Sequence, residues 1–182
     1  AFLGEKLSPA RKYVYGARDR MDERYDIIRS VRDHRYRYIR NYEPFKAYYQ
    51  YMNTPEGGPT MQELRRLHQL GQLPAAAELF MADHKPTEEL YDLENDPHEI
   101  HNLAESTDHQ KELVRLRAAH VKWMVETKDL GLIPEAEINL GTERLGSAYA
   151  ILRQPGKENL IARLRMLVLA AENGPAGLPR LI

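Results

Sequence analysis

The stretch Ile27-Ile-Arg-Ser-Val-Arg-Asp-His-Arg-Tyr-Arg-Tyr-Ile-Arg-Asn41 decides the fold. Residues alternate in character on both sides of Asp33-His34, which is typical of two strands, 27–32 and 35–41. The pattern therefore predicts an antiparallel β-hairpin that turns at Asp33-His34. Because a two-residue turn prefers Gly at its second position, His34 leaves the turn type open.

The second strand of this hairpin has two different faces. Tyr36 and Tyr38 fall on one face, and Arg35 and Arg37 fall on the other, because side chains alternate with a period of two. The surrounding sequence has the same character. The first fifty residues contain 12 Lys or Arg and 7 Asp or Glu, and nine of the eleven tyrosines lie within residues 13–51.

Two interpretations of this basic, aromatic segment remain open. Arginine binds oxyanions with paired N–H groups, and tyrosine packs against sugar rings, so a sulfated sugar would suit it. Single-stranded nucleic acid fits the same electrostatics. The alternative is an antiparallel sheet with tyrosine on its core face and arginine on its wet face.

Further strands are predicted on both sides of the hairpin. Lys12–Ala17 is rich in β-formers and closes near Gly16, and Glu89–Leu93 precedes an Asn95-Asp96-Pro97 turn. Residues 42–59 indicate an irregular connection, because Pro and Gly interrupt them. The fold class predicted is α+β, a small antiparallel β-sheet packed by a long helix and followed by an α-helical extension.

Helices are predicted from caps and apolar spacing. Thr60-Met-Gln-Glu63 is a capping-box pattern that opens a helix stopped by Gly71, and a short helix covers residues 75–81. Thr107-Asp-His-Gln110 is a second capping box, before a long helix that ends near Thr127 and crosses the sheet. Ile133–Ile138 is predicted to be a connector.

The C-terminal part differs in pattern. Residues 158–172 form an amphipathic helix with one apolar stripe, and residues 178–182 begin another segment. The apolar stripe needs a partner to cover it.

Composition excludes several classes of site. The 182 residues contain no cysteine, which removes disulfides and thiolate metal sites, and no apolar run approaches a membrane span. No serine lies in a Gly-x-Ser-x-Gly context, and no Gly-rich phosphate loop occurs. We predict no catalytic residue within this chain.

One segment does concentrate metal-ligand residue types, namely Asp92, Asp96, His98, Glu99 and His101. A zinc signature brings further ligands in a recognisable frame, whereas turn formation and capping explain these residues without a metal. We therefore predict no metal site. A further histidine, on the apolar side of the long helix at position 120, is interpreted as a core-edge residue rather than a base.

Two groups of phrases carry a family resemblance. The first comprises 16–23 (Gly-Ala-Arg-Asp-Arg-Met-Asp-Glu), 29–33 (Arg-Ser-Val-Arg-Asp) and 36–41 (Tyr-Arg-Tyr-Ile-Arg-Asn). The second comprises 89–97 (Glu-Leu-Tyr-Asp-Leu-Glu-Asn-Asp-Pro) and 102–104 (Asn-Leu-Ala). In this order they resemble the C-terminal subdomain of a type I, formylglycine-dependent sulfatase of the alkaline-phosphatase superfamily. The resemblance covers roughly residues 1–130 and weakens from Gly131, so it implies a division of the chain into residues 1–130 and 131–182.

The resemblance implies a larger parent enzyme. Such sulfatases carry a Cys or Ser followed by x-Pro-x-Arg, whose first residue becomes formylglycine, beside a calcium ion. Here Ser8-Pro-Ala-Arg11 has Leu7 two positions before its proline and cannot supply that group. The nucleophile, the calcium and the N-terminal catalytic subdomain are therefore expected outside this chain.

The resemblance also implies a substrate and a place. The parent would hydrolyse sulfate esters or sulfamates, with a sulfated saccharide as substrate, no nucleic acid as partner, and no membrane span. A periplasmic, extracellular or lysosomal location is suggested. Some sulfatases carry HEAT-like helical repeats after the catalytic domain, and residues 157–182 resemble the start of such an array.

Four residues are candidates for substrate binding. Arg18 and Arg20 offer planar donors to a sulfate, and Asp22 and Glu23 offer acceptors to sugar hydroxyls. Without the resemblance, they would be read as charges that pair on an exposed turn. Arg29 is interpreted as structural.

Two other function classes stay open. The chain could be a non-catalytic binding module for sulfated glycans or other polyanions, with binding that falls as salt rises. It could also be an interaction scaffold built on its C-terminal helices. Truncation after Asp129 separates the scaffold from the other two.

Overall fold

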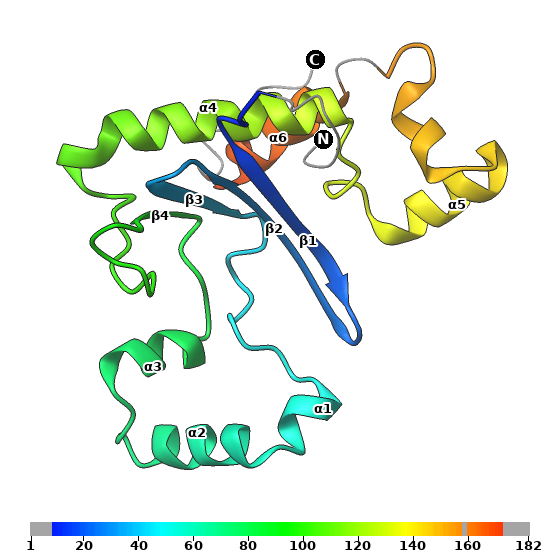
Figure 1. Ribbon diagram of the computed structural model, residues 1–182. Coiled ribbons are helices and arrows are strands. Elements are labelled where there is room, and N and C mark those ends of the chain that lie inside the picture. The colour runs from blue at the N-terminus through cyan, green and yellow to red at the C-terminus, as the bar shows by residue number, and fades with distance from the viewer. Residues whose placement is uncertain (1–8, 158–159, 173–182) are drawn as a thin grey trace, which may run out of the picture. The chain divides into compact units, whose positions relative to one another are not determined.

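The computed structural model describes residues 9–157 and 160–172 (Figure 1). Two compact units divide the chain, residues 1–117 and 118–182. Their boundary lies inside helix α4 (Gln110–Thr127). The division after residue 130 is a statement about family resemblance and stays a prediction.

A four-stranded antiparallel sheet organises the first unit. Its strands are β1 (Val14–Met21), β2 (Arg24–Arg32), β3 (Tyr36–Asn41) and β4 (Glu88–Asp92), in the spatial order β1-β2-β3-β4. This sheet with its helices confirms the α+β class. β4 begins and ends one residue before the predicted 89–93.

The core of the sheet is a row of side chains that crosses three strands. Val31 lies opposite Tyr38, and Tyr38 lies opposite Leu90. All three are at most 1% exposed. The Tyr38 ring can be buried because its hydroxyl keeps a hydrogen-bond partner: it donates to a Glu88 carboxylate oxygen at 2.6 Å.

The β2–β3 turn lies one residue further along the chain than predicted. Asp33 donates its N–H to the Tyr36 carbonyl at 3.0 Å, so His34 and Arg35 are the two central residues. Neither central residue has a positive φ. The Asp33 carboxylate accepts hydrogen bonds from the backbone N–H groups of Arg35 (2.9 Å) and Tyr36 (2.7 Å). The turn is therefore held by an aspartate side chain and not by a glycine with a positive φ.

β1 is longer than the predicted strand, which closed near Gly16. It runs on to Met21, so most of 16–23 is strand rather than loop, and only Asp22 and Glu23 form the turn. Gly16 stays inside the strand, where a Cβ would meet Ser30 Oγ at 2.7 Å. Glycine here permits a close approach between strands instead of ending one.

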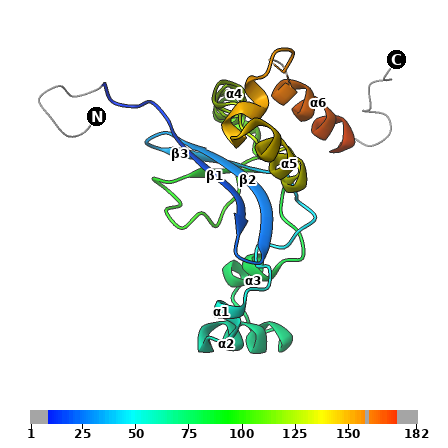
Figure 2. The same cartoon turned by 90° about the vertical axis from the view of Figure 1, so that its right-hand side faces the viewer.

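Three helices connect β3 to β4. They are α1 (Asn53–Glu56), α2 (Pro59–Gln69) and α3 (Ala75–Met81), and they gather at the end of the sheet toward which the β1–β2 turn points (Figures 1 and 2). α3 has the predicted bounds. The predicted capping box is wrong, because Gly58 is the N-cap of α2 and Thr60 lies in its first turn.

The second capping box is also wrong. The 3-10 turn η1 (Thr107–His109) precedes α4, and Ser106 stands at its N-cap without a side-chain cap bond. Ser106 Oγ instead lies 2.9 Å from His109 Nδ1. α4 ends at Thr127 as predicted.

The first two turns of α4 belong to the first unit and are tied to the sheet. Arg115 forms an ion pair with Asp33 at 2.6 Å, and Arg117 forms one with Glu88 at 2.5 Å. Leu116, which lies between these two arginines in the sequence, is completely buried. Ion pairs therefore flank an apolar contact, as the prediction of a helix packed on the sheet requires.

The second unit is helical. After the end of α4 it contains α5 (Glu135–Leu145), the 3-10 helix η2 (Ala148–Arg153) and α6 (Leu160–Glu172). The predicted connector at 133–138 is wrong, because α5 begins directly after Pro134. Of the predicted helix 158–172, positions 158–159 lie outside the described residues, as do 173–182.

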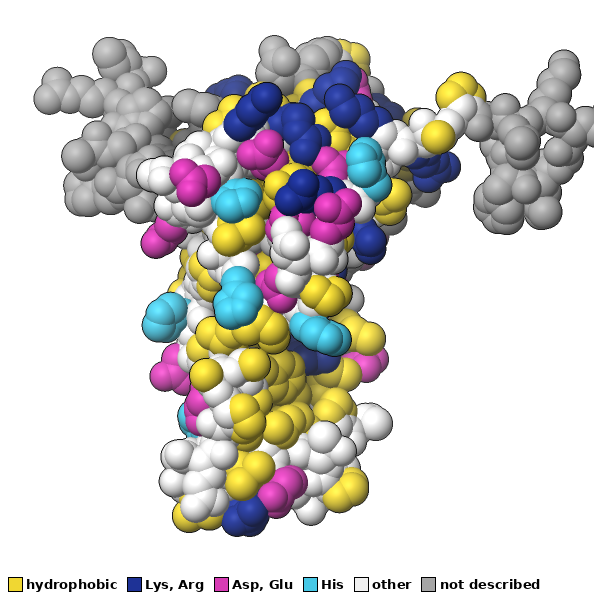
Figure 3. All heavy atoms as spheres, turned by 60° about the vertical axis from the view of Figure 1, so that its left-hand side comes forward, with side chains coloured by type: hydrophobic (Ala, Val, Ile, Leu, Met, Phe, Trp, Pro, Cys, Tyr) yellow, Lys and Arg dark blue, Asp and Glu magenta, His cyan; other side chains and the backbone are white. Residues whose placement is uncertain are grey.

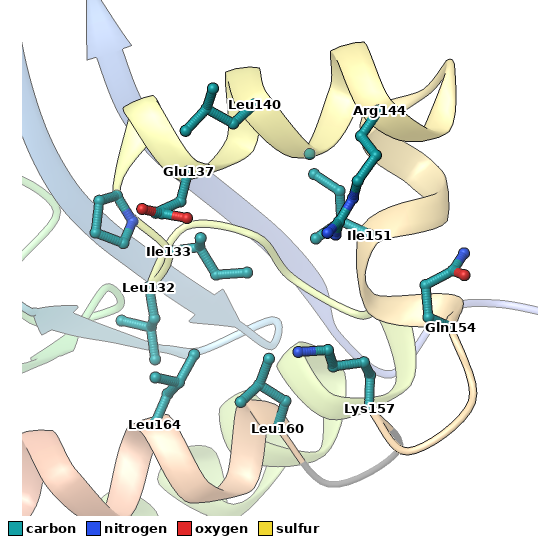
Figure 4. A pocket seen from close by; sticks show the side chains of 12 residues that line it. Leu132, Ile133, Glu137, Leu140, Arg144, Ile151, Gln154, Lys157, Leu160 and Leu164 are labelled. Atoms are coloured by element: carbon teal, nitrogen blue, oxygen red, sulfur yellow. The ribbon is translucent and has the colours of Figure 1, made fainter.

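α5 and η2 approach closely. A Cβ at Gly141 would meet Ile151 Cδ1 at 2.9 Å, so only glycine leaves room for this contact as it stands. α5, η2 and α6 surround a cavity of about 530 Å³ with apolar walls and the cationic side chains Arg144 and Lys157 (Figure 4). In the part of α4 within this unit, His120 is fully buried and not at the core edge.

Among the described helices, none combines the length and the apolar character that a bilayer crossing needs.

Candidate functional site

The β1–β2 hairpin carries all four residues predicted to bind substrate. Asp22 and Glu23 are the central residues of its turn, between the paired residues Met21 and Arg24. Asp22 has a φ of 50°, which Asp tolerates better than most residues. Glu23 accepts a hydrogen bond from Asn53 Nδ2 at 2.6 Å, which ties the turn to the first residue of α1.

The arginines of the hairpin differ in environment. Arg18 is half-buried opposite Ile28, and Arg20 is exposed opposite Tyr25. Within the described residues, the Nε and Nη2 of Arg18 and the Nε of Arg24 are buried without a hydrogen-bond partner. A buried donor without a partner is costly, so these N–H groups favour a bound oxyanion or another acceptor.

Arg29 fixes the backbone beneath these donors. Its side chain is fully buried and forms an ion pair with Asp19 at 2.7 Å. It also donates to the carbonyl oxygens of Arg18 and Ile28, both at 2.9 Å. A β-bulge lies at this point, between Arg18 and Arg20. The structural role predicted for Arg29 is therefore confirmed, and Asp19, which the sequence did not single out, is its partner.

Tyr49 connects the hairpin to the helices. Its ring lies 5.8 Å from the Arg24 guanidinium carbon and 5.5 Å from that of Arg65, within cation–π range of both. Its hydroxyl donates to Glu56 at 2.7 Å, and its ring centroid is 5.3 Å from that of Phe80. Residues of the hairpin, the connection and α3 thus meet at one ring.

A cavity of about 710 Å³ lies beside this ring, and sequence reasoning did not identify it. We name it the aromatic cavity. Figure 3 shows apolar side chains gathered in a hollow on this face, with histidines around them. Its lining includes two tyrosines, a phenylalanine, two histidines and two carboxylates: Tyr48, Tyr91, Phe80, His84, His98, Glu89 and Glu99.

Glu89 forms the polar floor of the aromatic cavity. It is 3% exposed and accepts hydrogen bonds from Tyr91 Oη (2.5 Å) and Asn41 Nδ2 (2.5 Å). Tyr48 also bonds to it. Burial, and then the neighbouring Glu89 carboxylate, raise the pKa of both tyrosines, because each phenolate would be desolvated next to a negative charge.

A buried ion pair holds the wall of the cavity. Lys85 Nζ lies 2.6 Å from Asp26 Oδ2, and neither side chain is exposed. Gln50 Nε2 donates to the same carboxylate oxygen at 3.3 Å. The pair joins the hairpin strand β2 to the segment after α3. Because the two residues lie far apart in the sequence, no local sequence pattern predicts it.

The chain is similar to parts of known sulfatases. No family model matches the chain. An ulvan-active sulfatase of Formosa agariphila is 43% identical over 138 residues, which cover 76% of this chain and 23% of that protein. The chain is related to sulfatases. A second ulvan-active sulfatase of the same organism is 31% identical over 122 residues, which cover 65% of this chain and 22% of that protein. The chain thus spans about a quarter of the length of these curated relatives.

The phrases that resemble sulfatases lie on neighbouring strands in this sulfatase-related chain. Arg35 holds Asp92 through two hydrogen bonds, Nε to Oδ1 at 3.0 Å and Nη2 to Oδ2 at 2.6 Å. The hydrogen bonds from Arg35 lower the pKa of Asp92 to about 2. Arg37 forms an ion pair with Glu99 at 2.8 Å. The two phrases also meet directly, because β3 pairs with β4 from Tyr36 opposite Asp92 to Ile39 opposite Glu89, and they form one structural frame.

The metal-ligand residue types near Asp92 have structural partners. Asp96 Oδ2 accepts the His101 N–H at 2.7 Å, and Asp92 accepts Asn95 Nδ2 at 2.8 Å. Over the described residues, no group of three or more His, Asp or Glu side chains is arranged to hold a metal ion. Turn formation and ion pairing account for the carboxylates of Asp92, Asp96 and Glu99.

Proposed function

We propose that this chain is the C-terminal, substrate-side part of a sulfatase that hydrolyses sulfate esters or sulfamates of a sulfated saccharide, with ulvan or a similar polymer as the substrate class. The observation that carries the proposal is the 43% identity to an ulvan-active sulfatase over 138 residues.

The hairpin supplies the substrate contacts in this proposal. Arg18 and Arg20 donate to the sulfate or to a neighbouring anionic group, and Asp22 and Glu23 accept from sugar hydroxyls. The buried, unsatisfied N–H groups of Arg18 support its assignment to an oxyanion. Arg24, with its buried Nε, joins this set.

Formylglycine and calcium do not fit the residues of this chain. It has no cysteine, none of its serines is followed by x-Pro-x-Arg, and its described residues form no cluster of metal ligands. We therefore assign no catalytic step to it. Both groups belong, in this proposal, to an N-terminal catalytic subdomain outside these residues, in a protein exported to the periplasm, the extracellular space or a lysosome.

The test uses the natural polypeptide as its source produces it. Peptide mapping searches for a Cys or Ser followed by x-Pro-x-Arg, and sulfate release is measured from ulvan oligosaccharides. Arg18→Ala should raise KM at least about tenfold with little change in kcat, because a charge-assisted hydrogen bond contributes about 1.5–3 kcal/mol. Arg11→Ala, at an exposed arginine outside the hairpin, is the matched control.

The alternative function is a non-catalytic module for sulfated glycans, which the unsatisfied arginine donors also favour. It predicts that the 182-residue chain binds sulfated oligosaccharides by itself, with affinity that falls as salt rises. A natural polypeptide without the Cys/Ser-x-Pro-x-Arg sequence and without sulfate release would leave this alternative and remove the enzyme.

A further inference from the structure

We infer that the aromatic cavity is a second saccharide subsite, which holds an uncharged sugar ring of the polymer next to the sulfated ring at the hairpin. This inference rests on the proposed function. The inference adds a second binding site to the hairpin, and it predicts which part of the polymer enters the cavity.

The size and the lining of the cavity suit a sugar ring. About 710 Å³ lies within the range of small-molecule sites, which are mainly apolar with a few placed polar groups. Phe80 and the half-buried Tyr48 offer ring surfaces against which the C–H groups of a pyranose can pack, and the buried Tyr91 completes the aromatic lining. Phe80 is 40% exposed and is therefore accessible from solvent.

The charges of the cavity argue against a sulfate inside it. Lys85 is neutralised by Asp26, and Glu99 by Arg37, at 2.6 and 2.8 Å. The Glu89 carboxyl group is buried beneath the cavity, where it accepts hydrogen bonds and offers no cation to an anionic ligand. A sulfate here would lose water without gaining a free cation, so an uncharged ring is favoured. The imidazoles of His84 and His98 can exchange hydrogen bonds with its hydroxyls.

One aromatic ring contacts both the lining of this cavity and the hairpin. Tyr49 contacts both sides: its ring centroid lies 5.8 Å from the Arg24 guanidinium carbon and 5.3 Å from the centroid of the Phe80 ring. A chain of sugars that crosses Tyr49 would therefore place a sulfated ring at the arginines and its neighbour in the cavity. Two adjacent subsites of different charge select a polymer that is not sulfated on every ring.

Calorimetric titration of the natural polypeptide with ulvan oligosaccharides that have been chemically desulfated and carboxyl-reduced, and are therefore uncharged, tests the inference. Phe80→Ala should weaken this binding about five- to tenfold, as expected for the loss of one aromatic contact. Phe45→Ala is the matched control, because Phe45 is 72% exposed and does not line the cavity. Thermal unfolding of both variants establishes that they fold.

The readouts separate the two proposals. If desulfated oligosaccharides bind and Phe80→Ala weakens them, the subsite stands even where no sulfate is released. If desulfated oligosaccharides do not bind, or if Phe80→Ala and Phe45→Ala have the same effect, the subsite is overturned. Sulfate release from a small aryl sulfate, which cannot reach the cavity, reports on the proposed function alone.

Discussion

The stability of the first unit depends strongly on two residues, Lys85 and Asp26. A charge without exposed surface is tolerated only when it is paired, because desolvation costs several kcal/mol for each ion. The second carboxylate oxygen of Asp26 has no hydrogen-bond partner within the described residues, so Lys85 carries most of the compensation.

Removal of Lys85 should therefore be severe. Lys85→Met is expected to lower the free energy of unfolding by about 3–5 kcal/mol, because it leaves Asp26 buried and charged. Lys122→Met, which removes an exposed ion pair with Glu126 on α4, should cost no more than about 0.5 kcal/mol. Urea denaturation of the 182-residue chain measures both. Equal losses in the two variants would contradict the buried-pair argument, whereas partial recovery in Lys85→Met with Asp26→Asn would support it.

Asp92 gives the stability a pH dependence at the same scale. Its pKa falls from 3.8 to about 2 on folding, chiefly through the Arg35 hydrogen bonds, so the contribution is present above about pH 4 and disappears as pH falls through about 2. Arg35→Met should lower the free energy of unfolding at neutral pH, because it removes both hydrogen bonds to Asp92. This difference from the unchanged chain should shrink toward zero near pH 2. A difference that is constant with pH would show that the loss is one of packing.

At the scale of elements, the two hairpin turns solve the same problem differently. The β1–β2 turn uses a positive φ at Asp22, whereas His34 in the β2–β3 turn has none, and the Asp33 carboxylate bonds to the backbone instead. Glycine should therefore have opposite effects in the two turns.

Two matched substitutions test this difference. Asp22→Gly is expected to raise the free energy of unfolding by about 0.5 kcal/mol, because it removes the cost of a left-handed backbone at a residue with a Cβ. His34→Gly is expected to lower it by about 0.5–1 kcal/mol, because it only adds freedom to the unfolded chain. Thermal and urea unfolding measure the pair. A gain in stability for His34→Gly would mean that the turn prefers a positive φ after all.

At the scale of the whole molecule, the proposed contacts lie in the first unit, and the helices after α4 lie in the second. A natural polypeptide that ends at Asp129 should keep its KM for ulvan oligosaccharides within about twofold. Its melting temperature should fall, because Met124 and His120 are buried members of the second unit, most of which is removed. A much larger rise in KM would place substrate contacts in the second unit. Loss of a protein partner at unchanged KM would identify the helices as a scaffold.

The sequence by itself determined the features that depend on neighbours in the chain. The alternation in 27–41 specified a hairpin, the Ala75–Met81 helix had its bounds predicted correctly, and the end of α4 at Thr127 followed from helical spacing. The order of the two phrases was sufficient to indicate a sulfatase relative. Side-chain period and turn chemistry act over a few residues, so they can be read without a fold.

Only the tertiary structure decided the features that depend on residues far apart. β1 extends through Arg18 and Arg20 because buried Arg29 pairs with Asp19 across the hairpin, which overrides the loop-like charge of that segment. Asp26 meets Lys85 over 59 residues, and Arg35 meets Asp92 over 57. The aromatic cavity needs β3, β4, α3 and two connections together. No local pattern encodes such contacts, because their free energy comes from burial that only the assembled fold creates.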